Sequence, residues 1–600
     1  MKAFTEPLLS LAGFEEMTKT AEKSSGLISV TGCIDAQKSQ MIYAFGGHRK
    51  NKLIVTFGEQ KAKELYDEYS FFDKEVVYYP SKDVLFYQSD IRGNLLTAER
   101  IRALKAIHEQ ERVTLVTTFD ALMNTMAPIE KMWENVLTLE QGQLLDLKEI
   151  QAALIRMGYE KEYQVQTMGQ FSVRGGILDV FPLTEENPIR IELWGDEIDT
   201  IRYFDCESQK SIENIDRVSI YPAAELVLSD EEKAGGIEKL KAEAKRVSDK
   251  LRKQMKTEEA HRVTVMADEL TEEWGELSMY AGMDAFLSYF FDERVGILDY
   301  FNPSDSLIFF DELTRCTEQG KLTETEFSES MKQRLAMGYI LPGQMNGLFT
   351  EKEIVAKLGK YSCIALAALD NKANGLHQLG SYGIHCQSVS PYNNSFELLI
   401  KDLKRYKKNG YRVILLSGSR TRAKRLSEDI TDQGITCFYT ENYDHELFEG
   451  QIMVCYGKVR RGFEYPILKF AVITESDIFG AQQKKKKRHR TYEGEKIQSF
   501  TDLSVGDYVV HENHGLGIYR GIEKLEVDKK VKDYIKIEYQ GGSNLYILAT
   551  QLDMIQKYAG KDARKPKLNK LGGQEWTRTK NRVRGAVKQI AGDLVKLYAQ

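Results

Sequence analysis

Two pairs of residues in this chain are of the types that bind nucleotides. Lys38 and Ser39 follow Gly32 at the spacing of a phosphate-binding loop, G-x-x-x-x-G-K-[ST]. In such a loop, glycines let backbone N–H groups close around the phosphates, and the lysine neutralises them. Here Gln37 replaces the second glycine, and Asp35 adds a negative charge to the cradle. We therefore predict a degenerate loop that does not bind nucleotide.

Asp311 and Glu312 form the second pair. They follow the apolar run 306–310, SLIFF, as carboxylates that hold Mg²⁺ and polarise water follow a buried strand. Such carboxylates act on a bound nucleotide, and residues 32–39 are predicted not to hold one. We interpret Asp311 and Glu312 as a relic, and we predict no catalytic residue and no cofactor for this chain.

Two histidines, His511 and His514, suggest metal binding. No cysteine or further histidine lies at ligand spacing nearby, and structural zinc takes four ligands. The order H-E-N-H also differs from the H-E-x-x-H of zinc proteases. We interpret both histidines as turn or surface residues and predict no metal site.

The elements that carry Lys38 and Asp311 are predicted to form one mostly parallel sheet. Buried-strand runs alternate with helical patterns such as residues 97–108, which is typical of a parallel sheet. The runs are 26–31, 51–57, 75–79 and 112–117, and we expect 306–310 and 363–368 to complete the sheet. Between these two groups, residues 160–221 carry strands separated by Gly and Pro turn signals, which indicates an inserted antiparallel domain.

The C-terminal part is predicted to contain a small β-barrel. A further α/β unit at 392–480 is followed by a basic run at 484–490, KKKKRHR, whose like charges favour a linker. Then come four short alternating runs rich in Val, Ile and Tyr, at 508–510, 517–522, 534–539 and 545–548. A module this short is expected to close as a strongly bent barrel. Apolar residues at helical spacing predict a helix over 574–600.

Composition places the chain among cytoplasmic proteins of several domains. It has 600 residues, no apolar run of membrane-spanning length and no signal-peptide pattern. Its seven cysteines are scattered, which favours a reducing compartment. Residues 481–600 hold 25 Lys and Arg against 14 Asp and Glu, a net charge of +11, and the other 480 residues have a net charge of −17. Any nucleic-acid contact is therefore expected in the C-terminal fifth, unless that charge belongs to a solvated linker and helix.

The run VGDYVVHENHGLGIYRGI, at 505–522, resembles the RNA-polymerase-interacting module of bacterial transcription-repair coupling factors, which also occurs in CarD-type regulators. The resemblance implies binding to the polymerase β subunit through an exposed strand edge. We expect Leu525 and Ile522 to make apolar contacts there, because Leu525 lies between Ile522 and a charged turn. The alternatives are an unrelated Tudor- or SH3-type barrel, and a Leu525 that belongs to the barrel core.

The phrases SVRGGILDVFP and IRIELWGDEIDTIRYFD resemble the domain, shared by UvrB and the coupling factors, that docks on the repair protein UvrA. In that family, two arginines and an aromatic residue on one sheet face make the contact. The matching positions are Arg174, Arg190 and Trp194, the last being usually Phe in the family. The alternative is that Arg190 faces solvent and Trp194 caps a local core. UvrB also carries a long aromatic hairpin that probes damaged DNA, and the short segment 78–100 implies that it is missing here.

Together these resemblances cover essentially the whole chain and imply the N-terminal part of a transcription-repair coupling factor. The implied fold is a multidomain α/β one. It has a degenerate RecA-like parallel sheet with an inserted antiparallel α+β domain, a second small α/β domain, a small β-barrel and a C-terminal helix. The expected segments are 1–150 and 226–390 for the UvrB-like domains 1a and 1b, 151–225 for the UvrA-binding-like insert, 391–480 for the small α/β domain, 481–498 for the linker, 499–562 for the barrel, and 572–600 for a helix leading to an absent motor.

The resemblance also implies a function. The intact family recognises stalled RNA polymerase, displaces it by ATP-driven translocation on double-stranded DNA, and recruits UvrA. ATP and Mg would belong to the absent motor, and this chain would supply the two docking surfaces. One alternative is a UvrB-type ATPase, which Gln37 and the short segment 78–100 disfavour. Another is a stand-alone CarD-type regulator, which would lack the first 480 residues.

Overall fold

We describe the protein from a computed structural model. The described residues are 1–46, 49–82, 94–206, 208–276, 283–369 and 375–480, and, nearer the C-terminus, 505–511, 514–527, 530–540, 543–548, 555–558, 566 and 568–569. The chain divides into two compact units, Met1–Gln483 and Lys484–Gln600. Each unit is described by itself below.

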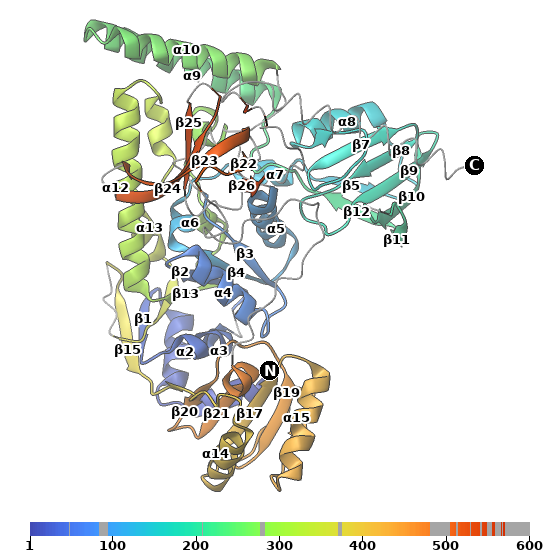
Figure 1. Cartoon of the computed structure of the whole chain (residues 1–600), viewed down its shortest axis with the longest axis vertical. Helices are drawn as coiled ribbons and strands as arrows, with labels where there is room; N and C mark the ends of the chain where they lie inside the picture. Colours follow the sequence, from blue (N-terminus) through green and yellow to red (C-terminus); the bar gives the residue numbers. More distant parts are fainter. Residues whose placement is uncertain are drawn as a thin grey trace. The chain divides into compact units, whose positions relative to one another are not determined.

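The first unit is built around a seven-stranded sheet in which every pairing is parallel (Figure 1). The strand order is β15 (Gln378–Gly383), β1 (Gly26–Thr31), β14 (Ser362–Leu366), β13 (Ser306–Asp311), β2 (Asn51–Thr56), β4 (Val113–Thr118) and β3 (Val76–Tyr79). Strands from before and after the inserted domain thus share one sheet, which confirms the sequence-based prediction. The edge strand β15 was not anticipated.

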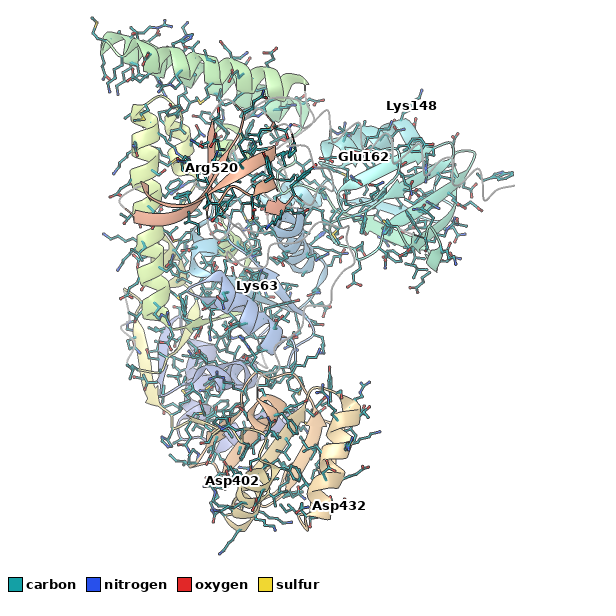
Figure 2. All side chains as sticks on the ribbon, in the orientation of Figure 1. Lys63, Lys148, Glu162, Asp402, Asp432 and Arg520 are labelled. Atoms are coloured by element: carbon teal, nitrogen blue, oxygen red, sulfur yellow. The ribbon has the colours of Figure 1, made fainter. Side chains whose placement is uncertain are left out.

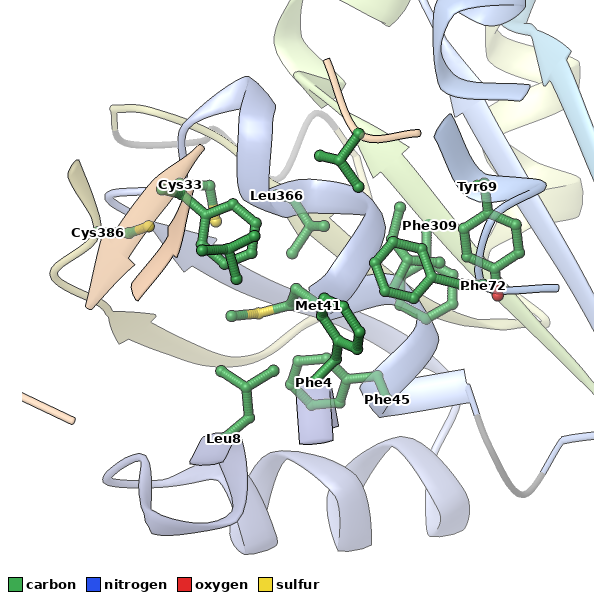
Figure 3. Packing of buried hydrophobic residues seen from close by; sticks show 14 of the residues in the cluster. Phe4, Leu8, Cys33, Met41, Phe45, Tyr69, Phe72, Phe309, Leu366 and Cys386 are labelled. Carbon is green, nitrogen blue, oxygen red and sulfur yellow. The ribbon is translucent and has the colours of Figure 1, made fainter. Parts of the chain in front are cut away.

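Except at the edge strand β15, both faces of this sheet are buried, as the continuous apolar runs require. Successive strand residues alternate between two cores: Ile28, Phe309 and Ile364 belong to one, and Leu27 and Ile308 to the other. Phe4, Leu8, Met41, Phe45 and Leu366 fill the first core (Figure 3). The helices of this region are α1 (Lys2–Thr5), α2 (Phe14–Lys23), α3 (Asp35–Gly46), α4 (Glu59–Tyr69), α5 (Asn94–Glu109), α6 (Phe119–Met123), α7 (Ile129–Trp133), α12 (Leu313–Ala336) and α13 (Glu351–Leu358).

The inserted domain contains a six-stranded sheet, antiparallel except for one short pair. Its order is β11 (Ser211–Ile215), β10 (Glu197–Phe204), β9 (Ile189–Trp194), β8 (Ile177–Val180), β7 (Gln170–Arg174) and β6 (Glu160–Lys161), with β6 and β7 parallel. Helix α8 (Leu147–Arg156) packs its Leu154 against the apolar face of this sheet. A separate ladder joins β5 (Leu137–Glu140) to β12 (Arg217–Ile220). Residues from 137 onward therefore belong to the inserted domain.

After the inserted domain the chain forms an antiparallel helical hairpin of α9 (Asp230–Lys253) and α10 (Thr257–Glu276), followed by α11 (Leu287–Phe290). A capping box at Ser229 starts α9: its hydroxyl accepts from the Glu232 N–H, and the Glu232 carboxylate accepts from the Ser229 N–H. Trp274, Phe286 and Leu341 belong to the core beneath the hairpin.

The small α/β domain of the first unit has a six-stranded sheet. The order is β16 (Gln387–Ser388), β20 (Phe463–Tyr465), β21 (Phe470–Thr474), β17 (Arg412–Ser417), β19 (Ile452–Tyr456) and β18 (Phe438–Tyr439). The last four are mutually parallel, and β16 and β20 add antiparallel pairs at one edge. Helices α14 (Phe396–Lys408), α15 (Arg420–Asp432) and α16 (Glu475–Phe479) accompany it. The α/β unit predicted for residues 392–480 is present.

In its described residues, the second unit has five antiparallel strands, in the order β25 (Asn544–Leu548), β24 (Lys530–Glu538), β23 (Gly515–Val527), β22 (Tyr508–His511) and β26 (Ile555–Lys557). The sequence predicts a closed barrel, whereas the described residues form an open sheet with β25 and β26 at its edges. Closure would need these two strands to pair, and β26 has only three residues to offer. The pairing of β23 with β24 is irregular between Tyr519 and Ile522, at Gly521 with φ +101°.

Several sequence-based predictions lie outside the described residues. They are the basic linker at 481–498, the helix over 572–600, and the central residues 83–93 of the segment compared with the UvrB hairpin. Among the helices described, none combines the length and the apolar composition that crossing a membrane requires.

Candidate functional site

The first site predicted from sequence lies where β1 ends and α3 begins. Lys38 is 1% exposed, and its ammonium contacts Asp311 at 2.5 Å, Glu312 at 3.0 Å and Asp35 at 3.2 Å. Burial alone would lower the pKa of Lys38, but attraction to Asp311 and its neighbours outweighs burial and raises it. The structure thus brings Lys38, from the first pair predicted from sequence, into contact with the second pair, Asp311 and Glu312. The charge of the lysine is neutralised by protein carboxylates.

The first two N–H groups of this turn are not free to hold a phosphate. The N–H of Gly32 donates to Ala368 at 3.2 Å, and that of Cys33 donates to Ala367 at 3.0 Å. A Cβ on Gly32 would lie 2.1 Å from the carbonyl oxygen of Ile384, so the chain after β15 crosses directly over the turn. A phosphate-binding loop needs its N–H groups turned toward the ligand. In this turn, the N–H groups of Gly32 and Cys33 are used within the protein.

The second predicted site is the polar face of the inserted sheet. Asp179 on β8 is 1% exposed and lies directly opposite Arg190 on β9. Arg190 Nε donates to Asp179 Oδ1 at 2.7 Å and Arg190 Nη2 donates to Oδ2 at 2.9 Å, while Arg174 Nη2 donates to the same Oδ2 at 2.7 Å. The hydrogen bond to Asp179 raises the pKa of Arg190. One buried carboxylate therefore orients both predicted arginines.

Arg190 is the more enclosed of the two arginines. Its side chain is 13% exposed, it also donates to Gln209 Oε1 at 2.8 Å, and its guanidinium carbon lies 4.3 Å from the centre of the Phe204 ring. The Arg174 side chain is 35% exposed. A partner therefore reaches Arg174 more easily. Arg190 mainly stabilises the face through its contacts, and only a small part of its guanidinium side chain is open to a partner.

Trp194 ends β9 and is 83% exposed, so it does not cap a local core. It borders a hollow of about 680 Å³ on the inserted domain, lined also by Glu197, Asp199 and Arg217 among others. On the same face of the sheet, Glu192 forms an ion pair with Arg202, and the hydrogen bond from Arg202 lowers the pKa of Glu192. The structure therefore brings Arg174 and Arg190 together and places Trp194 at the end of the same strand as Arg190.

The third predicted site lies on β23 in the second unit. Its proximal part pairs with β22 over Gly515–Ile518, and its distal part, from Ile522 to Val527, pairs with β24. Among the described residues no strand covers the other edge of this distal part. Ile522 is 42% exposed there, and Leu525 lies opposite Lys532 in the ladder, although its side chain is outside the described part.

The two histidines of the second unit lie together. Their ring centres are 4.8 Å apart, and His511 is 1% exposed. Burial, aided by the nearby His514, lowers the pKa of His511 to about 4. His511 is thus a buried residue of β22 and not the turn or surface residue predicted. In the described residues, no three His, Cys, Asp or Glu side chains gather as a metal site.

Sequence reasoning missed the residue that organises the arginine face. Asp179 lies within the apolar run ILDVF, and a carboxylate inside a buried strand is a signal that it has a charged partner. The partner could not be named because pairing register is not visible in the sequence.

Two family models match the chain. The UvrB interaction domain model covers residues 137–226, which is the inserted domain from β5 to β12. The CarD-like/TRCF RID domain model covers residues 503–559, which spans β22 to β26. The two arginines and Trp194 fall in the first match, and Ile522 and Leu525 fall in the second.

Curated proteins match over nearly the whole chain. A transcription-repair-coupling factor of Bacillus subtilis is 32% identical over 550 residues, covering 91% of this chain and 46% of that protein. One from Staphylococcus haemolyticus is 31% identical, covering 96% and 48%, and one from Staphylococcus aureus is 30% identical, covering 98% and 50%. The chain spans about half the length of the curated relatives it matches.

Fold and matches together define a multidomain α/β protein that carries a UvrB interaction domain and a CarD-like domain on one chain. The transcription-repair-coupling factors match 91–98% of this chain with about half of their own length, which confirms the resemblance found in the sequence.

Proposed function

We propose that this chain is a docking part in transcription-coupled DNA repair. The inserted domain would bind UvrA, and the sheet of the second unit would bind the β subunit of RNA polymerase. In a longer protein, a motor using ATP and Mg would move along double-stranded DNA to displace a stalled polymerase. We place this activity in the bacterial cytoplasm, and the seven free cysteines suit that compartment.

The observation that carries the proposal is the arginine pair held by Asp179 on a domain of the UvrB interaction type. Guanidinium groups present a rigid fork of donors that matches carboxylates on a partner. Because Asp179 fixes both arginines beforehand, little side-chain freedom is lost when a partner binds. Trp194 adds a large exposed apolar surface at the end of β9.

We also propose that the chain has no ATPase of its own. The amides of Gly32 and Cys33 are used within the protein, and Lys38 is held by Asp311 and Glu312. These contacts oppose the alternative of a UvrB-type ATPase, because a nucleotide would have to displace all of them.

Binding of the chain to immobilised UvrA tests the docking proposal. Arg174→Ala and Trp194→Ala each remove a side chain that the fold exposes, and we expect each to weaken binding at least about tenfold, within the range for interface anchors. Arg190→Glu would also weaken binding, but it places a second carboxylate against buried Asp179 and therefore disturbs the fold.

Arg156→Ala is the matched control. Arg156 is exposed in the last turn of α8, the helix that covers the apolar face of the sheet, opposite to the arginine face. This variant should bind UvrA as the wild type does. Equal UvrA affinity of wild type, Arg174→Ala and Trp194→Ala, with all three folded, would place the docking face elsewhere.

A further inference from the structure

The hairpin of α9 and α10 has a basic turn, although the first unit is acidic. Residues 245–256 contain six Lys and Arg and a single Asp, whereas the first 480 residues have a net charge of −17. Toward the other end of the hairpin the charge reverses, with Asp230, Glu231 and Glu232 opening α9 and Glu272, Glu273 and Glu276 closing α10. Glu258 and Glu259 open α10 at the basic end, so residues 245–259 still carry a net charge of +3, from six Lys and Arg against three Asp and Glu.

The shape of this turn is fixed by backbone hydrogen bonds. The N–H of Lys256 donates to Leu251 and that of Met255 donates to Arg252, both at 3.0 Å, which is the pattern of a Schellman motif. Met255 takes the left-handed position of the motif, with φ +62°, and is 87% exposed. Ser248 Oγ donates across the hairpin to the Ala260 carbonyl at 3.1 Å. The turn is thus a defined platform rather than a loose loop.

All six cations on this platform are exposed, and Figure 2 shows side chains projecting outward along the hairpin. Arg246 pairs with Glu243 at 2.9 Å, and Arg252 approaches Asp249 at 4.0 Å. No ion pair within the described part of the chain involves the remaining four, which are Lys245, Lys250, Lys253 and Lys256. Four ammonium groups therefore point into solvent within twelve residues.

Helix stability does not explain this arrangement. Cations in the last turn of α9 interact well with the helix dipole, but Lys256 directly precedes α10, where the dipole disfavours a positive charge. Arg246 and Lys250 are four residues apart and Lys250 and Lys253 three apart, and like charges at these spacings destabilise a helix. These like-charge contacts cost the free protein stability, and a polyanion would relieve that cost.

We propose that the turn of the α9–α10 hairpin, residues 245–256, contacts the phosphate backbone of double-stranded DNA. The helical part of this segment, residues 245–253, spans roughly 13 Å, and a duplex carries about one charge per 1.7 Å of its axis. Several lysines can therefore meet phosphates at once without distortion of the hairpin. The contact is independent of base sequence, and it adds a DNA-binding surface to the docking function proposed above.

Binding of the full chain to a labelled duplex, measured by fluorescence anisotropy at a series of KCl concentrations, tests this surface. The test variant is Lys250→Ala, Lys253→Ala and Lys256→Ala combined. Each phosphate contact contributes about 0.9 to the slope of log affinity against log salt. We expect the slope to fall by about 3 and the affinity at low salt to fall at least about tenfold.

The matched control removes three other exposed lysines, Lys148 on α8, Lys352 on α13 and Lys404 on α14 (Lys148 is labelled in Figure 2). It changes the net charge equally and should keep the wild-type slope. Contacts from the basic C-terminal fifth are the same in both variants, so the difference between them isolates the hairpin. Equal slopes and affinities for the two variants would overturn the proposal. So would a test variant that keeps its DNA affinity and loses binding to an acidic protein surface.

Discussion

The ammonium of Lys38 lies 2.5 Å from a carboxylate oxygen of Asp311, although 273 residues separate them in the chain. Both side chains are 1% exposed, and Thr56 donates a further hydrogen bond to Asp311 at 2.9 Å. In an active nucleotide site, residues at these positions would bind the phosphates and Mg²⁺. Here they bind each other. The pair links the start of α3 to the end of β13, across the two halves of the sheet that the inserted domain separates.

Replacing Lys38 with Met should destabilise the first unit by about 3–5 kcal/mol, because Asp311 would remain buried without its counter-charge. Urea denaturation measures this loss. The double variant Lys38→Met and Asp311→Asn should regain part of it, since no unpaired charge is then left at that position. Lys148→Met, on the exposed surface of α8, is the control. A Lys38→Met variant within about 1 kcal/mol of wild type would contradict a structural role for the pair.

Millimolar Mg-ATP should not raise the melting temperature of the chain, because a ligand stabilises a protein only by binding its folded state. The carbonyl of Ile384 lies over Gly32, and the N–H groups of Gly32 and Cys33 already have protein acceptors. Thermal unfolding with MgCl₂ at equal ionic strength provides the reference. A rise of several degrees specific to ATP, together with phosphate release, would restore the UvrB-type ATPase as the better hypothesis.

The sequence was sufficient to predict the parallel sheet. It did not predict that the chain after β15 covers the turn between β1 and α3. Buried runs such as 26–31 and 306–310 identify strands because their residues are apolar on both faces. Gln37 and Asp35 indicated a degenerate loop. The contact of Ile384 with the turn depends on β15, an exposed strand with the sequence QLGSYG, whose polar and glycine residues give no strand signal.

Glu225 should make the first unit sensitive to acid. Its carboxylate accepts from Arg100 Nε at 2.7 Å and lies 3.1 Å from the ammonium of Lys82. Burial would raise the pKa of Glu225, but Arg100 and Lys82 outweigh burial and lower it to about 2. Since the folded pKa lies below the unfolded value of about 4.3, the stabilisation is complete above pH 4.3 and is lost as pH falls toward 2.

The loss attributable to Glu225 is on the order of 3 kcal/mol. It is measured as the difference in unfolding free energy between wild type and Glu225→Gln at a series of pH values. That difference should be large at neutral pH and should shrink steadily below pH 4.3. A difference that stays constant from neutral pH to pH 3 would show that the Glu225 carboxylate has an ordinary pKa.

The arginine face and the hairpin show a second limit of the sequence. Arg174 and Arg190 were found by resemblance, whereas their common partner Asp179 required the register of β7, β8 and β9. The count of charges placed nucleic-acid contacts in the C-terminal fifth. The net charge of the first 480 residues hides the basic cluster at 245–256, because that cluster has only twelve residues. The basic run 245–256 is contiguous in the sequence, but only the pairing of α9 with α10 brings the acidic start of α9 and the acidic end of α10 together at the opposite end.

The distal half of β23 should be the polymerase-binding edge. From Ile522 to Val527 it pairs with β24, and in the described residues its other edge is open to accept a further strand. Ile522 is 42% exposed, so Ile522→Arg introduces its charge at little cost to the fold. In a complex that charge would be buried without a partner. We expect Ile522→Arg and Leu525→Arg each to weaken capture of the polymerase β subunit at least about tenfold, a typical loss at an interface anchor.

Tyr558→Arg is the control for this prediction, because Tyr558 is 44% exposed and follows β26, an edge strand two positions from β23. It should retain polymerase binding, and all three variants should retain UvrA binding, which depends on the first unit. Circular dichroism separates loss of contact from loss of fold: a Leu525→Arg variant that unfolds would assign Leu525 to the core of the sheet. Full polymerase binding by folded Ile522→Arg and Leu525→Arg would exclude this edge, and the β subunit would then have to dock on another part of the second unit.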